Sequence, residues 1–121
     1  MEKESFRYDI EGLAKDMEVE LSILSTLYSE YFHEMKINIE ESKTLANSED
    51  WFRLERVIHN IKGISTSLNI SDIYSFSNKL DVNLKNGKTD TAINDINTIN
   101  ELFNACENSV RQFFKEKEIL I

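Results

Sequence analysis

The chain contains no proline and only three glycines in 121 residues. These two residue types mark most tight turns and helix ends. An all-β domain of this length would need many turns, so their scarcity favours a small number of long helices. The length suffices for one hydrophobic core, and no repeat or linker divides it. Residues 1–121 are therefore predicted to form a single helical domain.

Apolar residues recur at helical spacing in five segments of the sequence. A short leading helix is predicted from apolar positions that follow 4-3-4 spacing, namely Phe6, Ile10, Leu13 and Met17. A long amphipathic helix then covers about residues 19–46, and the next covers residues 51–68. Between these two, Ser48 or Asp50 can cap the second helix, because short polar side chains accept hydrogen bonds from free backbone amides.

Two more helices follow in the second half of the chain. Ser71 is the predicted N-cap of the first, Gly87 its C-terminal stop, and the last helix starts near Thr89 or Asp90. Each of the four main helices has one apolar face, and the loops between them are short. The predicted fold is therefore all-α: an up-down antiparallel four-helix bundle with a short additional N-terminal helix.

Charge and cysteine content restrict the partners and the compartment. The formal net charge is −8, which argues against nucleic acid or an anionic membrane as a partner. No segment approaches the length of an apolar membrane span, and the N-terminus lacks the apolar core of a signal peptide. The one cysteine, Cys106, excludes an internal disulfide and falls on an apolar stripe as a core residue. We therefore expect a cytoplasmic protein.

The helix predicted over residues 51–68 carries a histidine on the face opposite its apolar stripe. Its apolar stripe consists of Leu54, Val57, Ile58, Ile61, Ile64, Ser65 and Leu68. At about 100° per residue, His59 and Gly63 each lie roughly 160° from the centre of this stripe, and Lys62 flanks them. Glycine in a helix interior costs on the order of 1 kcal/mol relative to alanine. Clearance for an approaching macromolecule would explain why this position has no side chain.

An exposed imidazole of this kind suits phosphoryl transfer. Imidazole is nucleophilic and largely neutral near pH 7, so a ring nitrogen can take a phosphoryl group and pass it to a carboxylate. The chemistry needs an exposed ring, a nearby cation and space for the active site of the partner. Thr66, one turn further along, could offer a hydroxyl to the same region. Glu55, four residues before His59, could hold the far ring nitrogen and fix the tautomer.

The sequence of residues 51–68 resembles the signature of histidine-containing phosphotransfer (HPt) domains, His-x-Leu/Ile-Lys-Gly-x-Ser/Ala-x-x-Leu. This chain carries it as His59-Asn60-Ile61-Lys62-Gly63, and Leu80-Asp81 and Gly87 resemble later features of the family. The similarity in length and helix order extends from about residue 8 to residue 116. It implies a four-helix bundle whose exposed histidine shuttles phosphoryl groups between aspartates of receiver domains in a multistep phosphorelay.

Carried over by position, the resemblance makes His59 the phosphoacceptor, Lys62 the cation that stabilises the phosphoryl group, and Gly63 the clearance residue. Asp81 stands where relatives often carry an acidic residue that can orient the histidine, and Asn69 stands where many members have glycine. The resemblance implies a phosphoryl carrier without catalytic activity of its own. It would bind no metal or cofactor, since the magnesium ion belongs to the partner receiver domain. Its expected partners are response-regulator receiver domains and a hybrid histidine kinase, with the chain itself a monomer.

Other interpretations remain open. The chain could be the phosphoacceptor domain of a chemotaxis-type histidine kinase, or a helical interaction module whose histidine does not transfer. Lys62, Thr66, Glu55 and Asp81 could each be ordinary solvated surface residues. Glu30 and His33 form one Glu-x-x-His motif, but a di-iron bundle site needs two such motifs and two more inward glutamates, and His33 is predicted to face away from the core. We therefore expect His33 to be a surface histidine.

Overall fold

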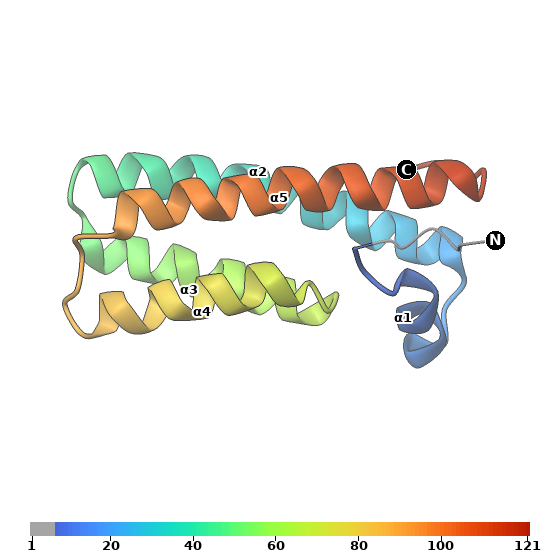
Figure 1. Cartoon of the computed structure of the whole chain (residues 1–121), viewed down its shortest axis with the longest axis horizontal. Coiled ribbons are helices and arrows are strands. Elements are labelled where there is room, and N and C mark those ends of the chain that lie inside the picture. Colours follow the sequence, from blue (N-terminus) through green and yellow to red (C-terminus); the bar gives the residue numbers. More distant parts are fainter. Residues whose placement is uncertain (1–6) are drawn as a thin grey trace.

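The computed structural model describes residues 7–121, which form five helices and no strand (Figure 1). The helices are α1 (Ile10–Met17), α2 (Leu21–Asn47), α3 (Trp51–Ser67), α4 (Ser71–Lys85) and α5 (Ala92–Glu116). The predicted all-α fold class is confirmed. Phe6, at the start of the predicted leading helix, lies outside the described residues. No helix within residues 7–121 combines the length and the apolarity needed to cross a membrane.

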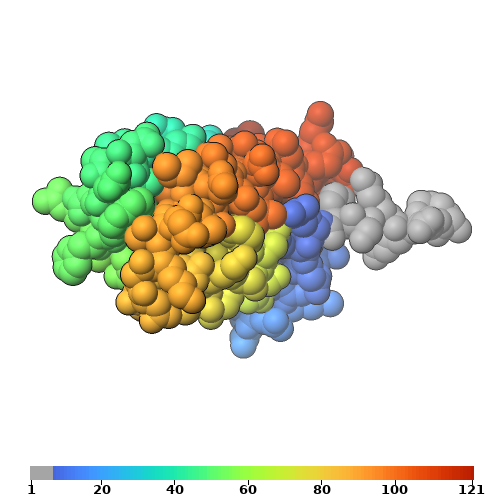
Figure 2. Space-filling model, turned by 60° about the vertical axis from the view of Figure 1, so that its left-hand side comes forward, coloured from blue at the N-terminus to red at the C-terminus, as the bar shows by residue number. Residues whose placement is uncertain are grey.

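The four longer helices pack in a ring of contacts. The α2 helix contacts α3 and α5, and α4 contacts the same two helices from the other side. Figure 1 shows that α2 and α5 extend beyond the turn that joins α3 to α4. The α1 helix contacts α2, and in Figure 2 it lies in blue near the red C-terminal part of the chain. The short helix therefore covers the end at which α3 and α4 have already stopped.

Aromatic side chains from α2 and α5 form the centre of the core. The rings of Tyr28 and Phe114 have centroids 6.0 Å apart, and those of Phe32 and Phe103 are also 6.0 Å apart. Cys106 is fully buried among them, as its place on the apolar stripe predicted. The contribution of α3 to this core comes from Leu54, Ile58, Ile61 and Ser65. The predicted stripe is thus the packed face of α3, and the face that carries His59 is left outside.

The ends of the helices test the predicted caps. Of the two candidates for α3, the structure selects Asp50, whose side chain accepts a hydrogen bond from the amide of Arg53 at 3.3 Å. The prediction for Ser71 is wrong, because Ser71 is the first residue of α4 and the N-cap is Ile70. Ile70 is completely buried, so tertiary packing of its side chain sets the start of this helix without a side-chain hydrogen bond.

The ends of α3 and α4 agree with the sequence analysis, whereas the start of α5 differs slightly from it. Asn69, after α3, has φ +56°, and Gly87, after α4, has φ +74°. Both helices therefore end as the sequence indicated. The α5 helix begins at Ala92 with Thr91 as its N-cap, slightly later than the predicted Thr89 or Asp90. The amide of Ala92 bonds to the carbonyl of Thr89 at 3.1 Å, so this stretch forms a turn before the helix.

Candidate functional site

His59 lies in the middle of α3, on the side away from the core. Its side chain is 60% exposed, whereas Ile58 and Ile61 on either side of it are completely buried. The predicted exposure of the ring is confirmed. His33 on α2 is exposed as well, as predicted. Exposure alone therefore does not separate the two histidines, and the surroundings of each ring must do so.

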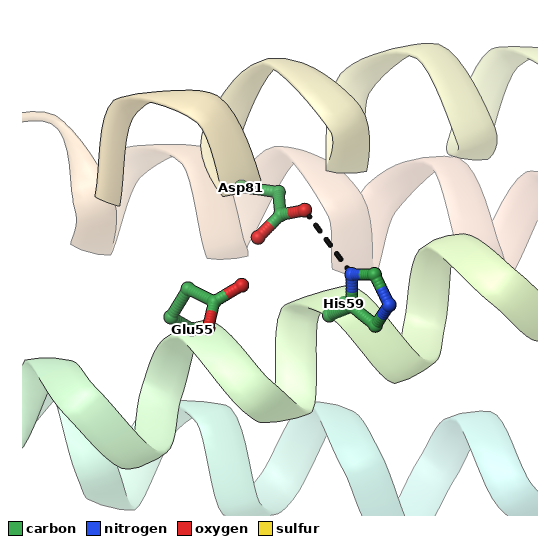
Figure 3. A group of neighbouring side chains, drawn as sticks. All are labelled: Glu55, His59 and Asp81. Carbon is green, nitrogen blue, oxygen red and sulfur yellow. Dashed lines mark hydrogen bonds and ion pairs between the residues drawn. The ribbon is translucent and has the colours of Figure 1, made fainter. Parts of the chain in front are cut away.

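Asp81 from α4 lies directly beside the His59 ring. The Nδ1 atom of His59 is 3.4 Å from the Oδ2 atom of Asp81, as Figure 3 shows. The Asp81 side chain is only 1% exposed. The alternative that Asp81 is a solvated charge on an exposed helix is therefore wrong. Its side chain points from α4 into the interface between α3 and α4, where it is buried.

Two lysines share the same carboxylate oxygen. Lys62 Nζ lies 3.0 Å and Lys85 Nζ 3.3 Å from Asp81 Oδ2. Lys62 also donates to Asn78 Oδ1 at 3.4 Å, and its side chain is 20% exposed compared with 53% for Lys85. The predicted cation beside the histidine is therefore present, but it is paired with a carboxylate. Lys85 is a second cation that the sequence analysis missed.

These contacts determine the charge of Asp81. Burial alone raises the pKa of a carboxyl group, but hydrogen bonds from neighbouring side chains act in the opposite direction and prevail. The neighbours are Glu55, Lys62, His59 and Lys85. Their combined effect holds the pKa of Asp81 well below its ordinary value. Asp81 is thus a carboxylate at neutral pH and can only accept hydrogen bonds.

The ionised carboxylate fixes the tautomer of His59. Because Asp81 Oδ2 has no proton to give, Nδ1 of His59 must be the donor across the 3.4 Å contact. In neutral imidazole the other nitrogen, Nε2, then carries the free lone pair. Figure 3 shows this second nitrogen on the side of the ring away from Asp81. The nitrogen with the free lone pair therefore lies on the side of an exposed ring that faces away from Asp81.

Glu55 faces Asp81 rather than the histidine ring. Its carboxylate lies 3.8 Å from Lys85 Nζ, and no hydrogen bond joins it to His59 within the described part of the chain. Oδ1 of Asp81 has no hydrogen-bond partner among residues 7–121, and in Figure 3 this oxygen points toward Glu55. Only protonated Glu55 can donate a hydrogen bond to Asp81, and this interaction, followed by burial, raises the pKa of Glu55. Of the two candidates for orienting His59, the geometry therefore selects Asp81.

Gly63 leaves an open space one turn beyond the histidine. A Cβ atom built at this position would meet no heavy atom within 4 Å. The backbone is also helical there, so neither crowding nor an unusual dihedral angle requires glycine. Since glycine weakens a helix interior, the fold alone does not account for this residue.

Thr66 is exposed, but its hydroxyl already has a partner. Its Oγ1 atom donates to the backbone carbonyl of Lys62 at 3.1 Å, four residues back in the same helix. This bond is the common local interaction of threonine within helices. The structure therefore places Thr66 beyond Gly63 without joining it to the cluster of His59, Lys62, Asp81 and Lys85.

A shallow depression of about 460 Å³ opens beside the histidine. It is lined by Glu55, Arg56, His59, Asn60 and Lys85. Arg56 and Lys85 were not among the predicted site residues. The spacing of four between Asp81 and Lys85 is a standard helical ion-pair signal that could have identified the second of them.

The carboxylates and the imidazole here do not suit a metal ion. Ligand atoms of Glu55, His59 and Asp81 lie within 4.8 Å of one another, which is close enough for shared coordination. However, the ammonium groups of Lys62 and Lys85 already contact the oxygen that would bind the ion. They neutralise the carboxylate and would repel a divalent cation.

Comparisons of this chain with protein-family models, with curated proteins and with solved structures found no match. The assignment of function therefore rests on the chemistry of the residues around His59.

Proposed function

We propose that the chain is a histidine phosphotransfer domain in which His59 accepts a phosphoryl group from the aspartyl phosphate of a receiver domain and passes it to a second receiver. The packing of α2 to α5 in a ring supports the up-down antiparallel four-helix arrangement that we propose with it. The observation that carries the proposal is the contact between His59 and the buried Asp81. In this contact the Asp81 carboxylate orients the ring through Nδ1, which leaves Nε2 as the nucleophilic nitrogen of an exposed ring.

The proposed transfer balances without another reactant. Nε2 of His59 attacks the phosphorus, a bond forms between nitrogen and phosphorus, and the bond to the aspartyl oxygen of the donor breaks. The donor leaves as a free carboxylate. The ring keeps its proton on Nδ1 and becomes positively charged, and the Asp81 carboxylate 3.4 Å away stabilises that charge. Attack by the carboxylate of a second receiver reverses these steps.

The two lysines have different parts in this proposal. Lys62 is mostly buried against Asp81 and Asn78, so it keeps the carboxylate ionised and in place. Lys85 is half exposed and lines the depression next to His59, so its ammonium group can exchange its contacts with Asp81 and Glu55 for contacts with phosphoryl oxygens. The phosphoryl-stabilising role predicted for Lys62 is thus shared with Lys85.

The domain supplies the nucleophile and the partner supplies the rest. We propose that the magnesium ion and the phosphorylated aspartate belong to the receiver, which approaches over the open space at Gly63. Since an acyl phosphate is already activated, the protein needs mainly to position a neutral imidazole near it.

The experiment is a transfer assay with a matched histidine control. Receiver domains of the source organism, phosphorylated on aspartate, are incubated with the wild-type chain, with His59→Gln and with His33→Gln. We expect an acid-labile phosphate on the wild type and on His33→Gln, and none on His59→Gln. His33 is the appropriate control because it is also exposed but sits on α2.

Persistent label on His59→Gln would disprove the assignment. A chain that no receiver labels, but that a kinase domain labels from ATP, would instead support the chemotaxis-type alternative. Receiver binding without any label would support a module that only associates.

A further inference from the structure

Charge is distributed unevenly over this acidic chain. Residues 51–85, which contain α3 and α4, carry five basic and three acidic residues, for a net charge of +2. The rest of the chain carries nine basic and nineteen acidic residues, for a net charge of −10. Of the three acidic residues in α3 and α4, Asp81 is buried and paired with lysines, and Asp72 pairs with Arg7. The third, Glu55, lines the depression beside His59 and lies 3.8 Å from Lys85, so one carboxylate there faces two cations, Arg56 and Lys85. The surface around His59 is therefore locally cationic.

An aromatic ring stands in solvent on the same side of α3 as His59. Phe52 is 75% exposed, although a phenylalanine normally gains by being buried. It precedes His59 by seven residues, so on a helix the two side chains project within about 20° of each other and roughly 10 Å apart along the axis. Nothing among residues 7–121 covers this ring, which leaves its apolar surface available for another molecule.

The depression beside His59 includes a residue that lies between Phe52 and His59 along α3. Arg56 follows Phe52 by four residues and precedes His59 by three, so it occupies the same face of the helix. Arg56 and Lys85 line the depression together with His59, Asn60 and one acidic residue, Glu55, so cations outnumber anions there. An aromatic anchor next to a cationic hollow is a composition typical of the energetically important part of a protein interface.

We propose that the face of α3 and α4 running from Phe52 through Arg56 and Lys85 to His59 is the docking surface for the acidic active-site face of the phosphoryl-exchanging receiver. This inference rests on the proposed function. A partner that carries an aspartyl phosphate and holds magnesium must present clustered carboxylates around the reacting group. The net charge of +2 on α3 and α4 complements such a surface, whereas the remaining surface would repel it. Phe52 supplies the apolar contact, and the cations guide the approach.

The test compares two variants of the proposed surface with two controls. Phe52→Ala and Arg56→Glu remove the anchor and reverse one charge, without changing His59 or Asp81. Ile37→Ala and Lys115→Glu make the same types of change on α2 and α5, where Ile37 is 54% exposed. Transfer from phosphorylated receiver domains is measured over a range of concentrations. We expect kcat/KM to fall about tenfold or more for each surface variant, through a higher KM, and to stay within about twofold for the controls.

A small phosphodonor separates docking from chemistry. Phosphoramidate transfers its phosphoryl group to histidine with release of ammonia and needs no protein contact. We expect all four variants to be labelled at the wild-type rate by this reagent. Transfer from the receiver should also slow as salt is raised, and less steeply for Arg56→Glu than for the wild type.

The outcomes distinguish the docking inference from the proposed function. If the wild type is labelled by receivers and the two surface variants keep its KM, the docking surface is wrong while the function stands. If the variants lose labelling by phosphoramidate as well, the residues act in the chemistry or the fold, and the docking inference is overturned. If no receiver labels the wild type, the proposed function fails and the docking inference fails with it.

Discussion

The helix pair α2 and α5 and the helix pair α3 and α4 are built on different chemistry. The first pair is long, with 27 and 25 residues, and interlocks through aromatic rings such as Phe32 and Phe103. The second pair is shorter, with 17 and 15 residues, and carries a buried carboxylate with two lysines at its contact. This difference indicates that one pair chiefly stabilises the fold, whereas the other holds His59, the phosphoacceptor of the proposed function.

The free energies of the two kinds of contact support this division. Burying one large apolar side chain stabilises a fold by about 1.5–3 kcal/mol. A buried ion pair contributes little by comparison, because removing the charges from water costs about as much as their attraction returns. The cluster around Asp81 is therefore an expensive way to join two helices. Its position beside the exposed His59 agrees instead with the role that we propose for it in phosphoryl transfer.

The largest expected effect comes from the aromatic pair of helices. Phe103→Ala would remove a ring that is 2% exposed and that contacts both Tyr31 and Phe32. We expect the free energy of unfolding to fall by about 3–5 kcal/mol, measured by urea denaturation. Under conditions where the variant is folded, its labelling by phosphoramidate should match the wild type. A loss of less than about 1 kcal/mol would contradict the proposed role of this pair.

A smaller effect is expected when the buried carboxylate is neutralised. Asp81→Asn leaves Lys62 and Lys85 without their anionic partner, and we expect a loss of about 1–3 kcal/mol at pH 7. The pKa of Asp81 is lower in the folded than in the unfolded state, so its contribution is present above about pH 4 and is lost as the pH falls below that value. The difference in stability between wild type and variant should therefore shrink from pH 6 to pH 3.

The contribution of Glu55 to stability should depend on pH in the direction opposite to that of Asp81. Its pKa is raised in the folded state by Asp81 and by burial, so its contribution is present at low pH and is lost as the pH rises through the folded value. The difference between wild type and Glu55→Gln should therefore change with pH in the direction opposite to that of Asp81→Asn. Identical profiles for the two variants would contradict the assigned pairing.

The smallest effect on stability is expected at Gly63, where substitutions should change stability and phosphoryl transfer independently. Gly63→Ala introduces a methyl group that meets nothing within 4 Å, so we expect the free energy of unfolding to rise by about 0.5–1 kcal/mol. The longer side chain of Gly63→Gln should leave the fold intact and block transfer from a receiver. A destabilised Gly63→Ala would show that the fold requires glycine here, and unimpaired transfer by Gly63→Gln would remove the clearance role.

Particular residues show which structural features could be predicted from sequence patterns. The exposure of His59 and the burial of Ile58 and Ile61 follow from a period of 3.6 residues within one helix. Gly87 and the pair of candidate caps Ser48 and Asp50 were found because helix ends depend on a few neighbouring residues, and the structure selected Asp50. Ser71 was misassigned because the burial of Ile70, a tertiary effect, sets the start of α4.

The net charge of the whole chain does not indicate the cationic surface around His59. A value of −8 predicts an acidic surface, but it is a sum over residues that the fold then separates. Only after α3 and α4 are seen to pack together does the cationic surface around His59 become apparent. The exposure of Phe52 follows from the same helical period as that of His59, and the structure adds that 75% of this residue is left uncovered by residues 7–121.

The amino-acid sequence by itself determined that this chain is helical, which face of each helix is apolar, and that His59 lies opposite the apolar face of its helix. These are local properties, since they depend on residues within a few turns. Only the tertiary structure decided that Asp81, 22 residues further along, is buried against His59 and holds Lys62 and Lys85. That outcome depends on how α4 is rotated and shifted against α3, which is set by side-chain packing across the whole core.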